Sequence, residues 1–238
     1  MRGFGTVINA ACILAGGILG LLFGKKLKPR MQETLRAATA AAVLFLGIGG
    51  ALEHMLSVQN GELSMGGSMM MIVSLAVGAV LGEWLNIDAG VERLGEWLKE
   101  KSNSTEDNSF VNGFVSASCT VCIGAMAVVG AIQDGISGDF SVLLAKGILD
   151  AIIICIMSAS QGKGCIFSVI PVVIFQGTVT LLAVFSGSFM TEAALNNLSF
   201  VGSVLIFCVG LNLIRDKRIR VANLLPAIFI AAAWGFFA

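Results

Sequence analysis

The sequence predicts an all-α fold, a polytopic bundle of about eight transmembrane helices in which some helices are kinked or broken. Of its 238 residues, 56% are hydrophobic and 13% are charged, and the mean hydropathy is +0.90. Globular domains usually carry about 25% charged residues. Uncharged runs close to the roughly 20 residues that a membrane-crossing helix needs recur along the chain. We therefore predict an integral membrane protein with a single transmembrane domain over residues 1–238.

Eight apolar segments account for the predicted spans. One of them, Phe140–Gly162, contains the charged residues Lys146 and Asp150, whereas the others contain no charge. Each segment is near the length that crosses about 30 Å of hydrocarbon at the helical rise per residue. The uncharged segments are Gly3–Gly24, Ala37–Leu52, Ser64–Gly82, Asn108–Gln133, Gly164–Thr191, Ala193–Ile214 and Val221–Ala238.

Prolines and glycines predict local features of these spans. Pro171 and Pro226 lie inside the sixth and eighth segments. Because proline removes a backbone hydrogen bond, we expect kinked or broken helices there, with freed backbone groups that line a polar cavity. Glycines at a spacing of four residues offer smooth faces for close helix contact in the first and third segments. These are Gly16, Gly20, Gly24, Gly78 and Gly82.

Basic residues predict the orientation of the chain in the membrane. Thirteen of the fifteen Lys and Arg residues fall in alternate loops, which the positive-inside rule assigns to the cytoplasm. Both termini should therefore lie outside. The thirteen are Lys25, Lys26, Lys28, Arg30, Arg36, Arg93, Lys99, Lys101, Lys163, Arg215, Lys217, Arg218 and Arg220. The opposite side holds Arg2 together with Glu53, Glu62, Asp134, Asp139 and Glu192.

The connection at residues 86–109 is predicted to form a cytoplasmic interfacial helix followed by a polar linker. Its apolar residues recur at helical spacing and are opposed by charged residues. Trp84 and Trp97 suit the headgroup boundary, and Ser102–Ser109 has the composition of a flexible linker. The helix is interpreted as a solvated amphipathic helix, and a docking surface for a soluble partner is the alternative. Its apolar residues are Ile87, Val91, Leu94 and Leu98.

Lys146 and Asp150 are the most informative residues, because they sit within an otherwise apolar run. A charge at membrane depth costs several kcal/mol unless it is partnered. If this helix enters near Phe140, Asp150 lies about 15 Å deep, close to the midplane. Secondary transporters usually bind substrate and coupling ion at that depth. The alternative is a neutralised pair that only ties this helix to its neighbours.

Polar residues in other spans extend the candidate site. Carboxamide side chains occur in four further segments and could converge with the charged pair on one interior site. The predicted substrate-binding or ion-binding residues are Asn9, Lys146, Asp150, Gln176, Asn212 and Asn223.

Other chemistries find little support in the sequence. The six cysteines include Cys119 and Cys122 at CxxC spacing, but the single histidine, His54, lies far from them in the sequence. Packing is the expected role of these cysteines, and no cofactor or metal is predicted. The chain carries no recognisable catalytic or nucleotide-binding motif, so we expect no enzyme. A net charge of zero argues against a nucleic-acid partner.

Six short motifs together suggest a known family. They are Gly5–Asn9, Lys146–Asp150, Gly162–Ser168, Gln176–Gly177, Gly210–Leu213 and Ile219–Pro226. With these motifs the chain resembles the YdfK/YqgA-like bacterial membrane proteins, a family whose domain has no assigned function. The chain departs from the family pattern at Gly147, Ala151 and Lys163. The resemblance covers essentially the whole chain and implies a multi-pass protein of the bacterial inner membrane, usually regarded as a transporter.

The leading functional hypothesis is a secondary transporter or permease for a small solute or ion. Asp150 would bind a proton or cation, and Lys146 would compensate its charge in the empty state. The alternative is a membrane scaffold or regulatory protein that recruits a partner through the helix near residues 87–101. Expected partners are the lipid bilayer and a small solute or ion, and a homo-oligomer is left open.

Overall fold

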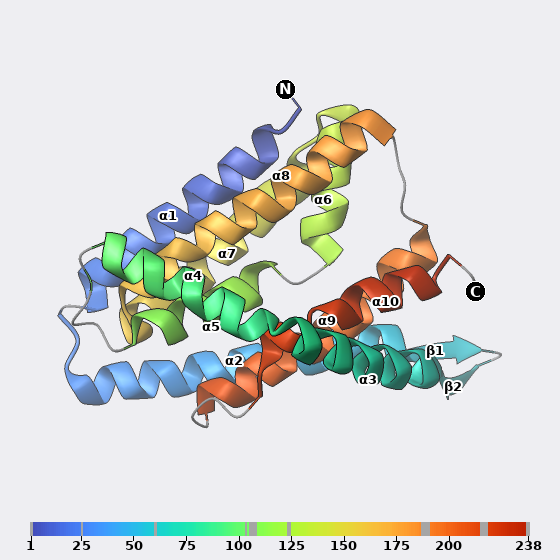
Figure 1. Cartoon of the computed structure of the whole chain (residues 1–238), viewed down its shortest axis with the longest axis horizontal. Helices are drawn as coiled ribbons and strands as arrows, with labels where there is room; N and C mark the ends of the chain where they lie inside the picture. Colours follow the sequence, from blue (N-terminus) through green and yellow to red (C-terminus); the bar gives the residue numbers. More distant parts are fainter. Residues whose placement is uncertain are drawn as a thin grey trace. The chain divides into compact units, whose positions relative to one another are not determined.

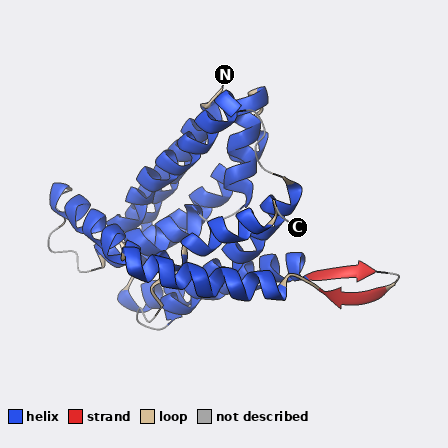
Figure 2. Ribbon diagram, turned by 45° about the vertical axis from the view of Figure 1, so that its right-hand side comes forward, coloured by secondary structure: helices blue, strands red, loops and turns tan. Residues whose placement is uncertain are grey.

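The computed structural model describes residues 2–24, 26–59, 61–102, 104, 109–122, 125–186, 191–214 and 219–236. Over these residues the chain forms helices and one small β-hairpin (Figure 2). Six helices are long and apolar enough to cross a membrane, and a bent pair raises the number to seven. The prediction of an all-α, polytopic bundle is confirmed, and the eighth predicted segment corresponds to a shorter apolar stretch, Val221–Trp234.

The chain divides into two compact units, and the single transmembrane domain over residues 1–238 stays a prediction. The first comprises Met1–Thr39, Val91–Cys122 and Met126–Phe189, and the second comprises Ala40–Gly90, Ile123–Ala125 and Met190–Ala238. The boundary between the units falls within two long helices, α2 (Pro29–Met55) and α4 (Ile87–Lys101).

The first unit is assembled around the contact between α1 and α7. A side-chain carbon added at Gly16 would lie 2.2 Å from the Ala151 carbonyl oxygen. One added at Gly20 would lie 2.1 Å from the Cys155 carbonyl oxygen. The predicted glycine face therefore meets the backbone of α7. Figure 1 labels the α-helices of this unit. Its helices are α1 (Phe4–Gly24), α5 (Phe110–Cys122), α6 (Ala125–Ser137), α7 (Ser141–Gln161), the 3-10 helix η1 (Lys163–Ser168) and α8 (Val169–Ser186).

An apolar core joins these helices. Ile13 of α1, Val121 of α5, Ile154 and Met157 of α7, and Val172 of α8 are buried together. Burial of such side chains contributes about 1.5–3 kcal/mol each relative to water. This core holds the polar residues of the unit in fixed positions.

The second unit uses the other predicted glycine face. Gly78 lies against Ala227, and a side chain at Gly82 would come within 1.8 Å of the Asn223 carbonyl oxygen. The helices and strands of this unit, besides its parts of α2 and α4, are β1 (Leu56–Gln59), β2 (Glu62–Met65), α3 (Ser68–Leu85), α9 (Glu192–Ile214), the 3-10 helix η2 (Val221–Leu224) and α10 (Pro226–Trp234).

Three predicted spans are interrupted. The 3-10 helix η1 precedes α8, which has Pro171 in its first turn, and η2 precedes α10, which begins at Pro226. These breaks confirm the expectation from the prolines. The third break was not expected, because α5 ends at Cys122, α6 begins at Ala125, and the two axes differ by 60°.

The hairpin is a second difference from the sequence prediction, which placed a polar turn between two spans. β1 and β2 pair antiparallel, with Leu56 opposite Met65 and Gln59 opposite Glu62. Gly61 adopts a φ of 84°, which glycine reaches without steric cost. The alternation of apolar and polar residues on both strands explains the pairing.

A helix is present where the interfacial helix was predicted, as α4, which begins at Ile87, and its place at the membrane interface stays a prediction. Leu98 is buried, whereas Trp97 is 53% exposed. Residues 103 and 105–108 of the predicted linker lie outside the described residues, as do Lys25, Arg215, Lys217 and Arg218. The inside–outside orientation stays a prediction.

Candidate functional site

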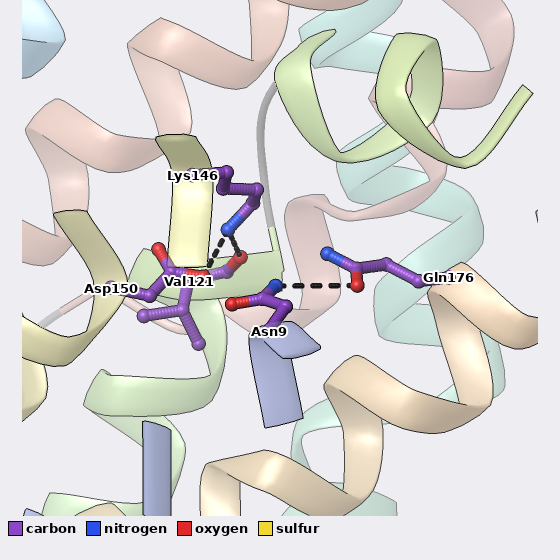
Figure 3. A network of polar contacts seen from close by, with 5 residues as sticks. All are labelled: Asn9, Val121, Lys146, Asp150 and Gln176. Atoms are coloured by element: carbon purple, nitrogen blue, oxygen red, sulfur yellow. Dashed lines mark hydrogen bonds and ion pairs between the residues drawn. The ribbon is translucent and has the colours of Figure 1, made fainter. Parts of the chain in front are cut away.

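Lys146 and Asp150 lie on one face of α7 and form an ion pair (Figure 3). Their spacing of four residues brings the side chains together one helical turn apart. Only 6% of Lys146 and 5% of Asp150 is exposed. Both charges are therefore removed from solvent, and each depends on the other for compensation.

Lys146 has a second partner at the break between α5 and α6. Its ammonium group donates a hydrogen bond of 2.8 Å to the backbone carbonyl of Val121. Val121 is the penultimate residue of α5, and carbonyls in the last turn of a helix lack partners within that helix. A cation is favourable at this end of a helix, because the aligned peptide dipoles leave it partly negative. Lys146 thus caps α5 while it pairs with Asp150.

Asn9 and Gln176 lie beside the charged pair. The Asn9 amide donates a hydrogen bond of 3.2 Å to the Gln176 side-chain oxygen, and both residues are fully buried. Figure 3 shows Asn9 between Asp150 and Gln176, and the Asn9 amide also interacts with the Asp150 carboxylate. Gly147 allows this approach, because a side-chain carbon there would lie only 3.3 Å from the Asn9 Cα atom. The structure therefore brings four of the six predicted residues together.

The two remaining residues belong to the second unit and have partners there. The Asn212 side chain donates to the Ile219 carbonyl at 2.7 Å and accepts from the Ile219 N–H at 3.1 Å. Asn223 accepts from the Asp88 N–H at 2.7 Å and donates to the Glu83 carboxylate, which also pairs with Arg220. Asn212 thus braces the connection into η2, and Asn223 joins η2 to α3 and α4.

Asp134 is a buried charged residue that the sequence interpretation placed among the outer acidic residues. It lies in the last turn of α6, is fully buried, and accepts a hydrogen bond of 2.9 Å from the Gly5 N–H at the start of α1. The available signal was its position directly after the uncharged run that ends at Gln133.

Asp139 shows the contrasting environment of an exposed carboxylate. It precedes α7 and accepts a hydrogen bond of 2.9 Å from the Ser141 N–H. The hydrogen bonds from the Ser141 backbone and side chain hold the pKa of Asp139 below its ordinary value. Asp139 is therefore ionised at neutral pH and serves as a reference for the buried carboxylates.

A cavity of about 250 Å³ opens at the C-terminal end of α7. Its lining includes Gln32, Ser158 and Gln161, and the last two are buried. Ser158 lies two helical turns from Asp150, which corresponds to about 12 Å along the helix. The cavity is lined by polar side chains at the C-terminal end of α7, and the charged pair lies further back along the same helix.

Metal-binding side chains are not clustered in the part of the chain that the structure describes. No group of three His, Cys, Asp or Glu residues among those residues could hold an ion. Cys119 is buried and Cys122 is half-buried, and neither forms a disulfide bond among the described residues. The four-residue cluster of Asn9, Lys146, Asp150 and Gln176 is therefore the best-supported candidate site of the first unit.

Comparison with known proteins assigns the family. A family model described as "Protein of unknown function (DUF554)" matches residues 4–236. The chain belongs to the DUF554 family. Among its relatives, the uncharacterized membrane protein YdfK of Bacillus subtilis (strain 168) is 29% identical over 227 residues, which cover 95% of this chain and 93% of YdfK. The uncharacterized protein YqgA of Escherichia coli (strain K12) is 28% identical over 238 residues, which cover 97% of both chains.

No solved structure is significantly similar to this DUF554 protein. The family, the relative that is named a membrane protein, and the apolar helices together establish that the chain is a membrane protein. The predicted resemblance to the YdfK/YqgA-like proteins is confirmed.

Proposed function

We propose that this DUF554 protein is a secondary transporter or permease for a small cation or a cation-coupled solute, with Asp150 as the ligand-binding carboxylate. The observation that carries the proposal is the buried Lys146–Asp150 pair of α7, in which Lys146 also contacts the end of α5 where that span is broken. The proposal assigns binding and release, and no bond-breaking chemistry, to these residues.

Stability alone is a weak reason to keep such a pair. Replacement of a buried ion pair by apolar residues of similar volume is often neutral or stabilising. Charged residues within membrane segments are also rare and usually mark ion or substrate pathways. A functional role for Asp150 accounts for the retention of both charges.

The break between α5 and α6 supports the same proposal. Transporter binding sites are typically formed by discontinuous helices whose ends face the ligand. Here the end of α5 faces the Lys146 ammonium group, which also contacts Asp150. A cation that binds Asp150 would replace Lys146 as its counter-charge, and the Val121 carbonyl would then retain the ammonium group.

Unsatisfied polar atoms indicate that the first unit can hold water or a ligand. Buried side-chain atoms usually have hydrogen-bond partners, and ordered water often supplies the missing ones. One Asn9 and one Gln176 polar atom have no partner among the described residues, whichever way the two amides are turned. The residues of this unit with such atoms are Thr6, Asn9, Ser118, Asp134, Ser158, Gln161, Ser168, Gln176 and Thr180.

The alternative function is a scaffold that recruits a partner through α4. Trp97 of this helix is 53% exposed, and Leu94 is 38% exposed. In that case the charged pair would serve only to cap α5, and no ligand response of the protein would depend on Asp150.

A ligand screen distinguishes the two functions. Thermal unfolding of the purified full chain in detergent would be measured across pH and against a panel of monovalent cations and small solutes. Asp150→Asn retains size and hydrogen bonding, and Asp139→Asn is the matched control. At least one response should be present in the wild type and in Asp139→Asn and absent in Asp150→Asn. Identical responses of wild type and Asp150→Asn to every condition would overturn the proposal in favour of the scaffold.

A further inference from the structure

Asp134 is buried without a counter-charge. It is fully buried, and none of the described Lys, Arg or His residues forms an ion pair with it. One carboxylate oxygen accepts the Gly5 N–H, and the other has no hydrogen-bond partner among the described residues. The positive end of α1 stabilises the carboxylate in part. One N–H leaves half of the group unsatisfied in an apolar environment, which is costly.

Two threonines at the same end of the unit also have unsatisfied hydroxyl groups. Thr6 is 6% exposed and Thr180 is 5% exposed, and neither hydroxyl has a partner among the described residues. In membrane helices such hydroxyls usually bond to a carbonyl one turn earlier. Thr120 of α5 does so, with a hydrogen bond of 2.7 Å to the Ser116 carbonyl.

Helix packing brings the three residues together. α1 and α8 run antiparallel, since Asn9 bonds to Gln176 while Gly17 approaches Ile166 just before α8. Thr6 lies one turn before Asn9, and Thr180 lies one turn after Gln176. The two threonines therefore occupy the next layer on the facing sides of α1 and α8.

Asp134 enters this layer from α6. A side-chain carbon at Gly5 would lie 3.0 Å from the Asp134 carboxylate, and one at Gly135 would lie 2.7 Å from the Thr180 carbonyl oxygen. The Asp134–Gly135 step is thus held between α1 and α8. Leu143 of α7, which is fully buried, covers Gly5.

We propose that Asp134, Thr6 and Thr180 form a binding site for a monovalent alkali cation, represented by Na⁺. Carboxylate and hydroxyl oxygens are the ligands of hard cations. A single carboxylate balances one positive charge, whereas a divalent ion would leave a net charge in an apolar layer. The site is separate from the Lys146–Asp150 pair and does not require that the pair transports anything.

Binding of radiolabelled Na⁺ to the purified full chain at constant pH and ionic strength tests the site. Choline replaces Na⁺ in the reference buffer. Asp134→Asn keeps an acceptor for the Gly5 N–H but lacks the charge, and Thr6→Val and Thr180→Val remove one hydroxyl each. We expect Asp134→Asn to lose this binding and each threonine variant to raise its Kd by about tenfold, the effect of one lost ligand.

Two controls separate this site from the rest of the unit. Thr120→Val removes a hydroxyl that already has a backbone partner, and Asp150→Asn removes the other buried carboxylate. Both variants should keep the Na⁺ binding that depends on Asp134. Should Asp134→Asn not fold, the two threonine variants still test the proposal. Unchanged Na⁺ binding in both threonine variants would overturn it. Stabilisation of the wild type by low pH without any Na⁺ binding would also overturn it, and would make Asp134 a proton site.

Discussion

Lys146 of α7 donates a hydrogen bond of 2.8 Å to the carbonyl of Val121, the penultimate residue of α5. One buried ammonium group therefore neutralises Asp150 and satisfies a backbone group that the break after α5 leaves free. This hydrogen bond links a charged pair, which could be recognised in the sequence, to a break in a helix, which could not be recognised there.

The two charges should be strongly coupled in stability. Lys146→Met or Asp150→Leu alone leaves an uncompensated buried charge, which typically destabilises by about 3–5 kcal/mol. The double variant should recover most of that loss, with a coupling free energy of about 1 kcal/mol or more. A double-mutant cycle on unfolding in detergent measures it. The exposed Glu83–Arg220 pair is the control, and its coupling should stay below about 1 kcal/mol. Additive losses at Lys146 and Asp150 would contradict the assignment.

Close contact of α1 with α7 predicts a large effect of one added methyl group. Gly20→Ala should destabilise the protein by about 1–3 kcal/mol, because the new carbon would lie 2.1 Å from the Cys155 carbonyl oxygen. Gly177→Ala in α8 is the matched control, since nothing lies within 4 Å of the added carbon. That variant should be neutral or stabilised by up to about 1 kcal/mol. Equal effects in thermal unfolding would show that the glycine face does not carry the contact.

Because Asn212 holds the backbone of Ile219, its replacement should reduce stability and leave the response to ligands unchanged. Asn212→Ala leaves both backbone groups of Ile219 without their side-chain partner, which should cost about 1–3 kcal/mol. Asn196→Ala, at an exposed position of the same helix, should change stability by less than about 0.5 kcal/mol. Folded Asn212→Ala should retain every ligand response of the wild type, and loss of a response would place Asn212 in the binding site.

The orientation follows from charge and can be tested by labelling. In a background without the six native cysteines, a cysteine at Lys28 should react with an impermeant thiol reagent only after permeabilisation. A cysteine at Glu62, in the hairpin, should react in intact cells. The reverse pattern would invert the predicted topology.

Composition and hydropathy predicted the helices, because a span needs little more than length and apolarity. Pro171 and Pro226 also predicted their breaks, since a proline acts on its own backbone. The bend after Cys122 could not be predicted in this way. The segment 108–133 contains neither proline nor charge, and the partner of the freed Val121 carbonyl lies 25 residues further along the chain.

The candidate site was predictable only in part for the same reason. Asn9, Lys146, Asp150 and Gln176 were visible because each is polar within an apolar run. Asn212 looks identical in sequence but has a local partner, the backbone of Ile219 seven residues later. The burial of Asp134 could not be predicted, because a charge at the end of an apolar run marks a loop in most chains, whereas here the helix continues to Ser137.

Ion flux into proteoliposomes tests the central claim about Asp150 most directly. Purified wild type, Asp150→Asn and Asp139→Asn would be reconstituted in equal amounts, with a gradient of protons, Na⁺ or K⁺ outside and a dye sensitive to that ion inside. We predict flux above that of empty liposomes for the wild type and Asp139→Asn, and none for Asp150→Asn. Flux through Asp150→Asn at the wild-type rate, or no flux above empty liposomes in the wild type for any gradient, would contradict the account.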